Sequence, residues 1–127
     1  MMFVTNPVYL SLSLPVILSI LIAHWIADFI AQTDQMAKNK STSNKWLISH
    51  VMTYGITMGF LMVIMLSKIP IIWLLVNTVA HGATDYVTSR ITSRLWKANE
   101  VHWFFVVVGL DQLIHMMTMF ITAAYLI

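Results

Sequence analysis

Histidine and aspartate recur at one fixed spacing in this 127-residue sequence. Three pairs have their members four positions apart: His24 and Asp28, His81 and Asp85, and Asp111 and His115. On a helix, residues four apart lie on the same face. Imidazole and carboxylate groups bind zinc, iron and manganese, and they also transfer protons in acid–base chemistry. The spacing therefore predicts three helices, each with a pair suited to metal binding or proton transfer.

The composition is that of an integral membrane protein. Hydrophobic residues make up 59% of the chain and charged residues only 9%, and the mean hydropathy is +0.80. Soluble domains contain about 25% charged residues, so the composition excludes an ordinary soluble domain, a disordered tail and a nucleic-acid binder. The net charge of +2 requires no acidic partner. Because there is no cysteine, a metal would need histidine, carboxylate or backbone ligands.

Four apolar stretches are long enough to cross a bilayer as helices, which requires about 20 residues. They cover approximately residues 8–36, 45–66, 70–90 and 102–127, and the first opens at Asn6-Pro7, a suitable helix start. His24 and Asp28 interrupt the first stretch, which also lacks a basic leader, so we expect it to be retained rather than cleaved as a signal. We therefore predict an all-α fold: one transmembrane domain, residues 1–127, forming a four-helix bundle.

Basic residues predict the orientation of this bundle. Six of the seven lie in the first and third connections, namely Lys38, Lys40, Lys45, Arg90, Arg94 and Lys97, and only Lys68 lies in the second. By the positive-inside rule, the first and third connections are cytoplasmic and both termini face the non-cytoplasmic side, with the bacterial inner membrane as the expected location. We expect aromatic residues at both interfaces: Trp46, Trp96 and Trp103 at the inner one, and Tyr9, Trp73 and Tyr125 at the outer one.

The polar residues should face the interior of the bundle. Each charged side chain at the membrane centre costs about 2.5–3.5 kcal/mol on insertion scales. With alternating helix directions, the three pairs meet at one level, with each aspartate nearer the cytoplasm, and His50 lies closer to the inner surface. No lysine or arginine is expected deep in a span, so protons, protonated histidines or a metal ion must compensate the three carboxylates.

The candidate metal ligands form one set from all four helices: His24, Asp28, His50, His81, Asp85, Asp111 and His115. A divalent metal is expected as cofactor, zinc first and manganese or iron as alternatives. One ion and two carboxylate-bridged ions both fit the ligand number. A purely structural, hydrogen-bonded polar core is the alternative to metal binding.

The ordered motifs resemble a family of small bacterial and phage membrane proteins that is known only as a domain of unknown function. The resemblance rests on the run HWIADFIAQTDQMA from His24 to Ala37, on Lys38, Lys40 and Ser41, and on motifs in the later spans. It covers nearly the whole chain. It implies that the signature positions are His24, Asp28, Gln32, His50, His81, Asp85, Asp111, Gln112 and His115. The His-xxx-Asp pairs more loosely resemble the YdjM-like membrane-bound metal-dependent hydrolases.

The leading functional hypothesis is a metal-dependent hydrolase that acts on a lipid or lipid-linked ester or phosphoester near the cytoplasmic head groups. Asp28, Asp85 or Asp111 would act as general base, and Gln32, Gln112 and Lys40 would orient the substrate. Two alternatives stay open: a non-enzymatic bundle that conducts protons or divalent cations, and a phage structural, lysis or exclusion module. Membrane lipid is the expected partner, and a homo-oligomer is compatible with each hypothesis.

Overall fold

The computed structural model describes residues 11–127, which form helices and short turns and no strand. The elements are α1 (Leu14–Trp25), the π-helical turn η1 (Ile26–Ile30), α2 (Asp34–Asn39), α3 (Asn44–Leu66), α4 (Ile71–Lys97) and α5 (Val101–Leu126). The prediction of an all-helical chain is confirmed. The expected helix start at Asn6-Pro7 and the expected interfacial Tyr9 lie outside the described residues.

The first apolar stretch is divided, where the sequence predicts one helix to residue 36. Pro15 lies in the first turn of α1, where its missing N–H group costs no hydrogen bond. The helix then widens into η1, in which Ala31 N–H donates to the Ile26 carbonyl over 2.8 Å. Thr33 caps the start of α2, because its Oγ1 accepts a hydrogen bond of 3.2 Å from the backbone N–H of Met36. The polar segment after Ile30 thus turns away from the axis of α1.

Two left-handed residues close the other helices. Ser67, with a φ of 57°, ends α3, and Asn99, with a φ of 58°, lies in the turn between α4 and α5. A residue in this conformation stops a helix, and N–H groups at its end still satisfy the last carbonyl groups: Ser67 N–H donates to the Val63 carbonyl and Glu100 N–H to the Leu95 carbonyl. The third predicted span ends near residue 90, whereas α4 continues to Lys97, because no glycine or proline follows Arg90 within it.

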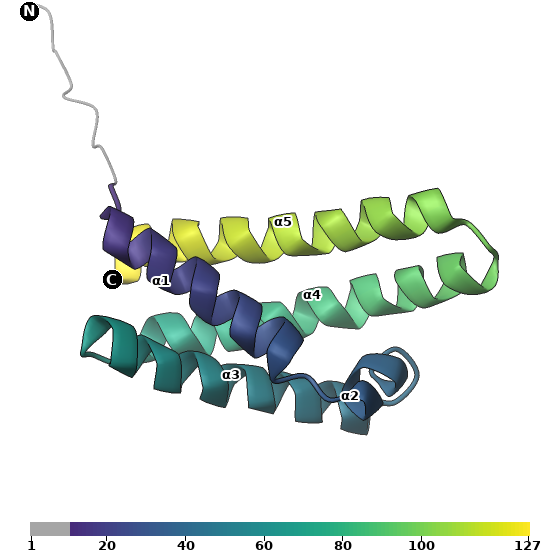
Figure 1. Ribbon diagram of the computed structural model, residues 1–127, viewed down its shortest axis with the longest axis horizontal. Coiled ribbons are helices and arrows are strands. Elements are labelled where there is room, and N and C mark those ends of the chain that lie inside the picture. Colours follow the sequence, from purple (N-terminus) through teal and green to yellow (C-terminus); the bar gives the residue numbers. More distant parts are fainter. Residues whose placement is uncertain (1–10) are drawn as a thin grey trace, which may run out of the picture.

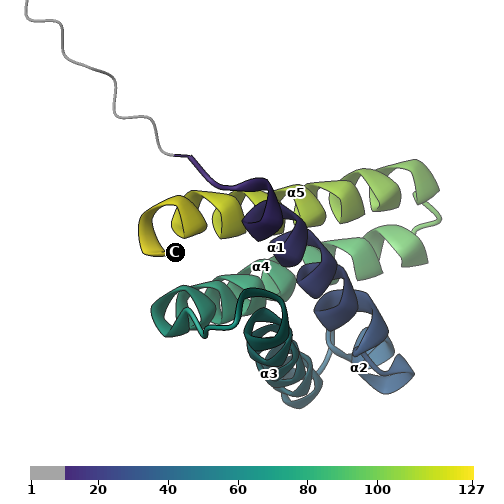
Figure 2. The ribbon, with the colours of Figure 1, turned by 60° about the vertical axis from the view of Figure 1, so that its left-hand side comes forward.

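Helix α4 is central to the arrangement, since it packs against both α3 and α5, while α1 contacts α3 and α5 (Figures 1 and 2). The start of α1, the α3–α4 turn and the C-terminus lie at one end of the molecule (Figure 1). Helix α2 and the α4–α5 turn lie at the opposite end, so the basic first and third connections share that end.

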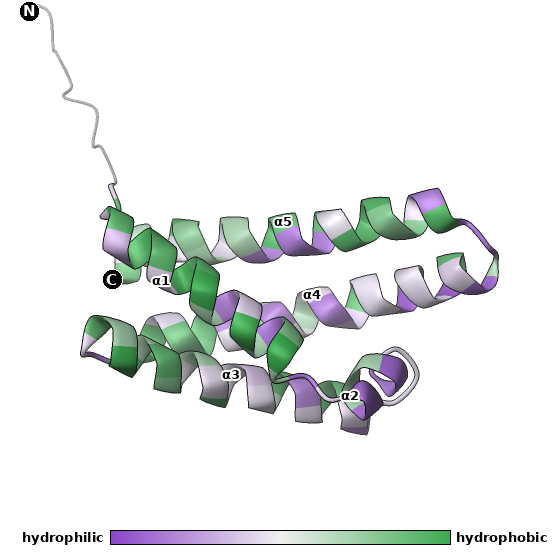
Figure 3. Cartoon of the chain, viewed as in Figure 1, coloured by the Kyte–Doolittle hydropathy of each residue, from purple (hydrophilic) through white to green (hydrophobic). Residues whose placement is uncertain are grey.

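Many large apolar side chains are exposed, whereas polar residues such as Asp28 and His50 are buried. Along the ribbon, hydrophobic positions predominate near the C-terminus and hydrophilic positions near α2 (Figure 3). Helices α3 and α5 are long and apolar enough to cross a membrane, and only 28% and 11% of their apolar windows are buried inside the structure. Exposed residues include Ile56, Phe60, Phe105 and Ile121. A surface of this kind is suited to contact with lipid tails.

Trp73 differs from the expectation of an interfacial position. Its side chain is 0% exposed and its indole Nε1–H donates to the Met119 carbonyl over 3.0 Å. It packs with Ile20, Met58 and Met62 in an apolar core at the end of the molecule opposite α2. The indole therefore joins α4 to α5 and does not mark the membrane surface.

Two glycines provide a test of the packing between α3 and α4. A Cβ atom at Gly55 would lie 2.9 Å from Thr78 Oγ1, which is held by its hydrogen bond to the Leu74 carbonyl, whereas a Cβ atom at Gly109 meets no atom within 4 Å. We expect Gly55→Leu to lower the free energy of unfolding by about 1–3 kcal/mol, and Gly109→Leu to change it by about 0.5 kcal/mol or less. Thermal unfolding in detergent micelles checks both values; equal losses would contradict close packing at Gly55.

Candidate metal centre

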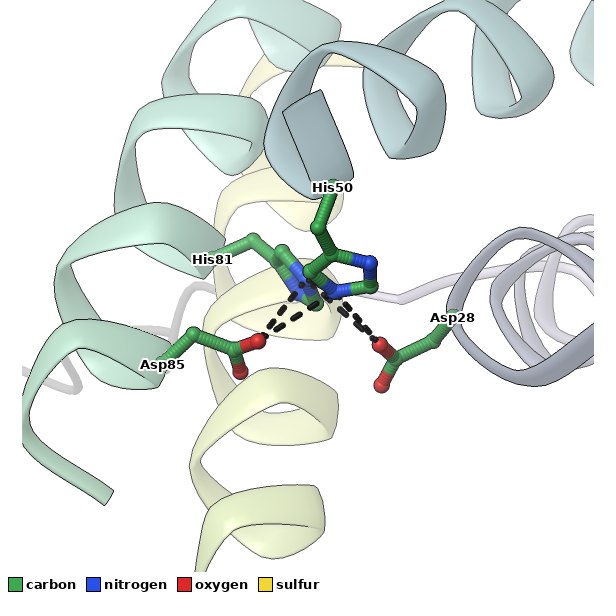
Figure 4. A group of neighbouring side chains, drawn as sticks. All are labelled: Asp28, His50, His81 and Asp85. Carbon is green, nitrogen blue, oxygen red and sulfur yellow. Dashed lines mark hydrogen bonds and ion pairs between the residues drawn. The ribbon is translucent and has the colours of Figure 1, made fainter. Parts of the chain in front are cut away.

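Four side chains from three elements converge on one point in the interior (Figure 4). Asp28 extends from η1, His50 from α3, and His81 and Asp85 from α4. His50 Nε2 lies 3.2 Å from Asp28 Oδ1, 3.2 Å from Asp85 Oδ2 and 3.0 Å from His81 Nε2. His81 Nε2 lies 3.5 Å from Asp28 Oδ1 and 3.7 Å from Asp85 Oδ2. All four residues are buried.

These separations match the ligand shell of one small metal ion. A tetrahedral zinc ion with bonds of about 2.0–2.1 Å holds its ligand atoms about 3.3–3.4 Å apart. The five separations given above range from 3.0 to 3.7 Å around that value. The four atoms can therefore bind a common ion after shifts of a few tenths of an ångström.

Lys40 also reaches this cluster, and the expectation that no basic side chain lies near the carboxylates is wrong. Its Nζ donates to Asp85 Oδ2 over 2.7 Å, and the side chains are 18% and 2% exposed. The short turn after α2 places the lysine beside the cluster, although Lys40 and Asp85 are far apart in sequence. Because sequence spacing carries no information about this fold-back, the contact is not predictable from it.

Lys40 compensates only part of the interior charge. Near the centre of the described structure lie three carboxylates, Asp28, Asp85 and Asp111, and one ammonium group, Lys40. The histidines beside them are uncharged unless they are protonated. Three carboxylates and one ammonium leave a charge of minus two when the histidines are neutral. A single divalent cation would bring the interior to neutrality, and so would protonation of two of these groups, either of which removes the high cost of a buried net charge.

His50 lies at the level of His81 rather than nearer the surface, so its predicted depth is wrong. Asp85 is followed by about 18 Å of α4, whereas His50 lies about 9 Å from the start of α3, at a rise of 1.5 Å per residue. The predicted depth of His50 holds only if neighbouring helices begin at the same level. In the structure α3 begins deeper, because α2 and its turns occupy that end of the molecule (Figure 1).

A network of hydrogen bonds around Gln112 holds the Asp28 carboxylate. Gln112 Nε2 donates to Asp28 Oδ2 and to Asp111 Oδ2, each over 3.1 Å, while Gln112 Oε1 lies 2.9 Å from His24 Nε2. His24 Nδ1 lies 3.1 Å from the Tyr54 hydroxyl. Both nitrogens of His24 therefore have a polar neighbour, and the Tyr54 hydroxyl also lies within donating distance, 3.6 Å, of Met119 Sδ. His24 thus orients this network, although it lies near Asp28 and His115 in a possible ligand group.

Asp111 and His115 lie beside the central four. Asp111 Oδ1 accepts a 2.5 Å hydrogen bond from Thr88, and its side chain is 14% exposed. His115 Nδ1 lies 3.7 Å from Asp111 Oδ2 and 3.8 Å from Asp28 Oδ2, and its Nε2 lies 3.6 Å from Asp85 Oδ1. Both His115 nitrogens are buried without a hydrogen-bond partner among the described residues. Asp85, Asp111 and His115 therefore form a second group whose ligand atoms lie close enough to hold an ion.

A cavity of about 250 Å³ gives access to the carboxylates. Asp28, Asp85 and Asp111 line it, together with Gln32 and Lys40, and its apolar wall includes Phe29, Phe104 and Val108. No histidine is among the described residues that line it. Gln32 Oε1 is buried and has no hydrogen-bond partner among residues 11–127. The cavity thus presents a free acceptor, an ammonium and three carboxylates to an entering molecule.

Tyr54 and Thr88 belong to the site but are missing from the predicted site residues. The Tyr54 ring stacks on His81 with centroids 3.8 Å apart, and Thr88 donates to Asp111. Tyr54 follows His50 by four positions and Thr88 follows Asp85 by three, so both share a helical face with a predicted ligand. Extending each ligand stripe by one turn is the signal that would identify them.

Comparison with known proteins identifies a family without supplying an activity. A family model described as "Protein of unknown function (DUF3307)" matches residues 16–127, which include every residue of the site. No curated protein and no solved structure matches the chain significantly.

Proposed function

The chain belongs to the DUF3307 family, and we propose that it is a membrane-embedded, metal-dependent hydrolase that acts on a lipid or lipid-linked ester or phosphoester. The observation that carries the proposal is the convergence of Asp28, His50, His81 and Asp85 on one point beside a cavity. The exposed apolar surface and the cluster of basic residues at one end support four membrane spans with that end in the cytoplasm. The bacterial inner membrane is the corresponding location.

We propose one divalent ion, with zinc as the first candidate because two imidazoles and carboxylate oxygens at these separations suit it. Manganese and iron accept the same ligands. His50, His81 and Asp28 form the permanent ligand set. Asp85 is an exchangeable fourth ligand, because Lys40 holds the same oxygen that faces the ion. Exchange at this position matters because a catalytic ion needs an open place for water or substrate.

When bound, such an ion lowers the pKa of a coordinated water towards about 7 and polarises an ester oxygen. Asp111 is the proposed general base, since it is the most exposed of the three carboxylates and lines the cavity. It accepts a proton from the water whose oxygen adds to the ester, and it returns that proton to the departing alkoxide. Thr88 and Gln112 hold its carboxylate in place, and Gln32 and Lys40 face the substrate. The net reaction consumes ester and water and yields acid and alcohol.

Ion or proton conduction is supported less well than hydrolysis. A conducting bundle needs polar groups along its full length. On the side of the cluster away from the cavity, the buried residues include Ile20, Met58, Met62, Trp73 and Met119. Asn77, which donates to Thr122 Oγ1, is a buried polar residue in this region, so a largely apolar core separates the cluster from the opposite end of the molecule. A cavity that opens at one end suits a substrate that enters and leaves by the same route.

The hydrolase proposal is tested with protein purified in detergent and loaded with zinc. We expect cleavage of a fluorogenic phospholipid ester or a lipid phosphoester, loss of that cleavage after removal of zinc by a chelator, and recovery when zinc is restored. Asp111→Asn should retain zinc but lower the turnover rate by about 10²–10⁴, the usual contribution of a general base. Zinc-free protein that moves protons across liposome membranes would instead favour conduction.

A further inference from the structure

A basic groove adjoins the acidic cavity at the α2 end of the molecule. It has a volume of about 490 Å³ and is lined on its polar side by Lys38, Lys40 and Lys97. No carboxylate is among the described residues that line it. The neighbouring cavity is lined by three carboxylates. One continuous surface therefore passes from a region that attracts cations to one that attracts anions.

The cavity and the groove meet at shared residues. Lys40, Ser89, Thr92 and Phe104 line both of them. Ser89 is only 8% exposed, and its Oγ has no hydrogen-bond partner within the described part of the chain. A buried hydroxyl without a partner is costly unless a ligand or water completes it. The junction thus offers an ammonium and a free hydroxyl to one polar group of a bound molecule.

Aromatic side chains form the other wall of the groove. Trp96 is 59% exposed and Phe105 is 62% exposed, and both line it beside Phe104. Tryptophan favours the level of the lipid head groups, and lysine there attracts anionic head groups. Basic groups beside exposed aromatic rings suit a molecule with an anionic head and apolar chains.

We propose that this groove binds the phosphate of an anionic membrane lipid, so that an ester next to the phosphate reaches the metal centre. The inference rests on the proposed function and narrows its substrate class to phosphate-bearing lipids. Lys38 and Lys97 contact the phosphate from the outer side, Lys40 and Ser89 contact it at the junction, and the aromatic wall supports the acyl chains. Charge complementarity selects an anionic lipid over a zwitterionic one.

The test must distinguish lipid binding in the groove from attraction of the lipid to the overall positive charge at this end of the molecule. The double variant Lys38→Gln/Lys97→Gln removes two groove charges, and Lys45→Gln/Arg94→Gln removes two charges from the same connections without touching residues that line the groove. Both variants therefore change net charge and positive-inside bias equally. Binding of dihexanoyl phosphatidic acid, dihexanoyl phosphatidylcholine and inorganic phosphate is measured by calorimetry in detergent, with metal-free protein and with zinc-loaded protein.

We expect the groove variant to bind phosphatidic acid about tenfold more weakly, as loss of charge-assisted hydrogen bonds implies, and the control variant to bind it within about twofold of the unaltered protein. Phosphatidylcholine should bind more weakly to all three. Equal loss in both variants, no loss in either, or inorganic phosphate binding as tightly as phosphatidic acid would each overturn the inference. Zinc content is measured in parallel, because normal zinc binding with no lipid selectivity refutes only the groove, whereas absence of zinc binding refutes the proposed function.

Discussion

Replacing Asp28 and Asp85 together by asparagine is expected to reduce the bound metal from about one ion per chain to none. Their oxygens are 3.2 Å from His50 Nε2 on either side, so they supply both negatively charged ligands of the proposed ion. Asparagine keeps the size of the side chain but removes its charge. Elemental analysis of protein purified and dialysed in the same zinc-containing buffer measures the ratio.

The matched control is Asp34→Asn with His102→Ala. Asp34 begins α2 and His102 lies exposed near the start of α5, and neither belongs to a possible ligand group. This variant should retain the metal. A ratio that survives the change at Asp28 and Asp85 would show that the ion is held elsewhere.

Thermal unfolding of the Asp28→Asn/Asp85→Asn protein and of the unaltered protein shows whether misfolding causes the loss of metal. Without metal, the unaltered protein carries uncompensated buried carboxylates, and replacing buried charges with neutral groups is often neutral or stabilising. We therefore expect the Asp28→Asn/Asp85→Asn protein to unfold at a temperature no lower than that of the metal-free unaltered protein. Only the unaltered protein should then gain thermal stability when zinc is added.

Replacing Lys40 by methionine is expected to change metal affinity and catalysis in opposite directions. Lys40 Nζ competes with the ion for Asp85 Oδ2, which it contacts at 2.7 Å. Loss of a hydrogen bond between charged groups corresponds to about a tenfold change in affinity, so zinc should bind about tenfold more tightly. Asp85 then becomes a permanent fourth ligand and closes the position needed for water, so turnover should fall at least about tenfold.

Competitive titration with a chromogenic zinc chelator measures the affinity, and hydrolysis of the lipid ester measures turnover. Lys45→Met is the control, because Lys45 is exposed in the first turn of α3 and does not line the cavity. A Lys40→Met protein with weaker zinc binding would show that the ammonium supports the ion rather than competing with it. Unchanged zinc affinity and unchanged turnover would show that Lys40 affects neither metal binding nor catalysis.

Much of this protein follows from its sequence. The long apolar stretches determine that the chain is helical, and the repeated spacing of four determines which polar residues share a face, because both depend only on the period of a helix. The three His/Asp pairs and His50 do lie together in the structure. A local signal also explains the start of α1, because Pro15 lies in its first turn.

Only the tertiary structure decides how these faces meet. It places His50 level with His81, leaves His24 occupied by Gln112 and Tyr54, and returns Lys40 from the α2 turn to Asp85. Each of these contacts joins residues that are 30 or more positions apart. Helical periodicity determines direction around one axis, but it contains no information about stagger between axes or the path of a turn. The sequence therefore identifies the groups available for chemistry, and the packing of α1, α3, α4 and α5 determines which of them can share one ion.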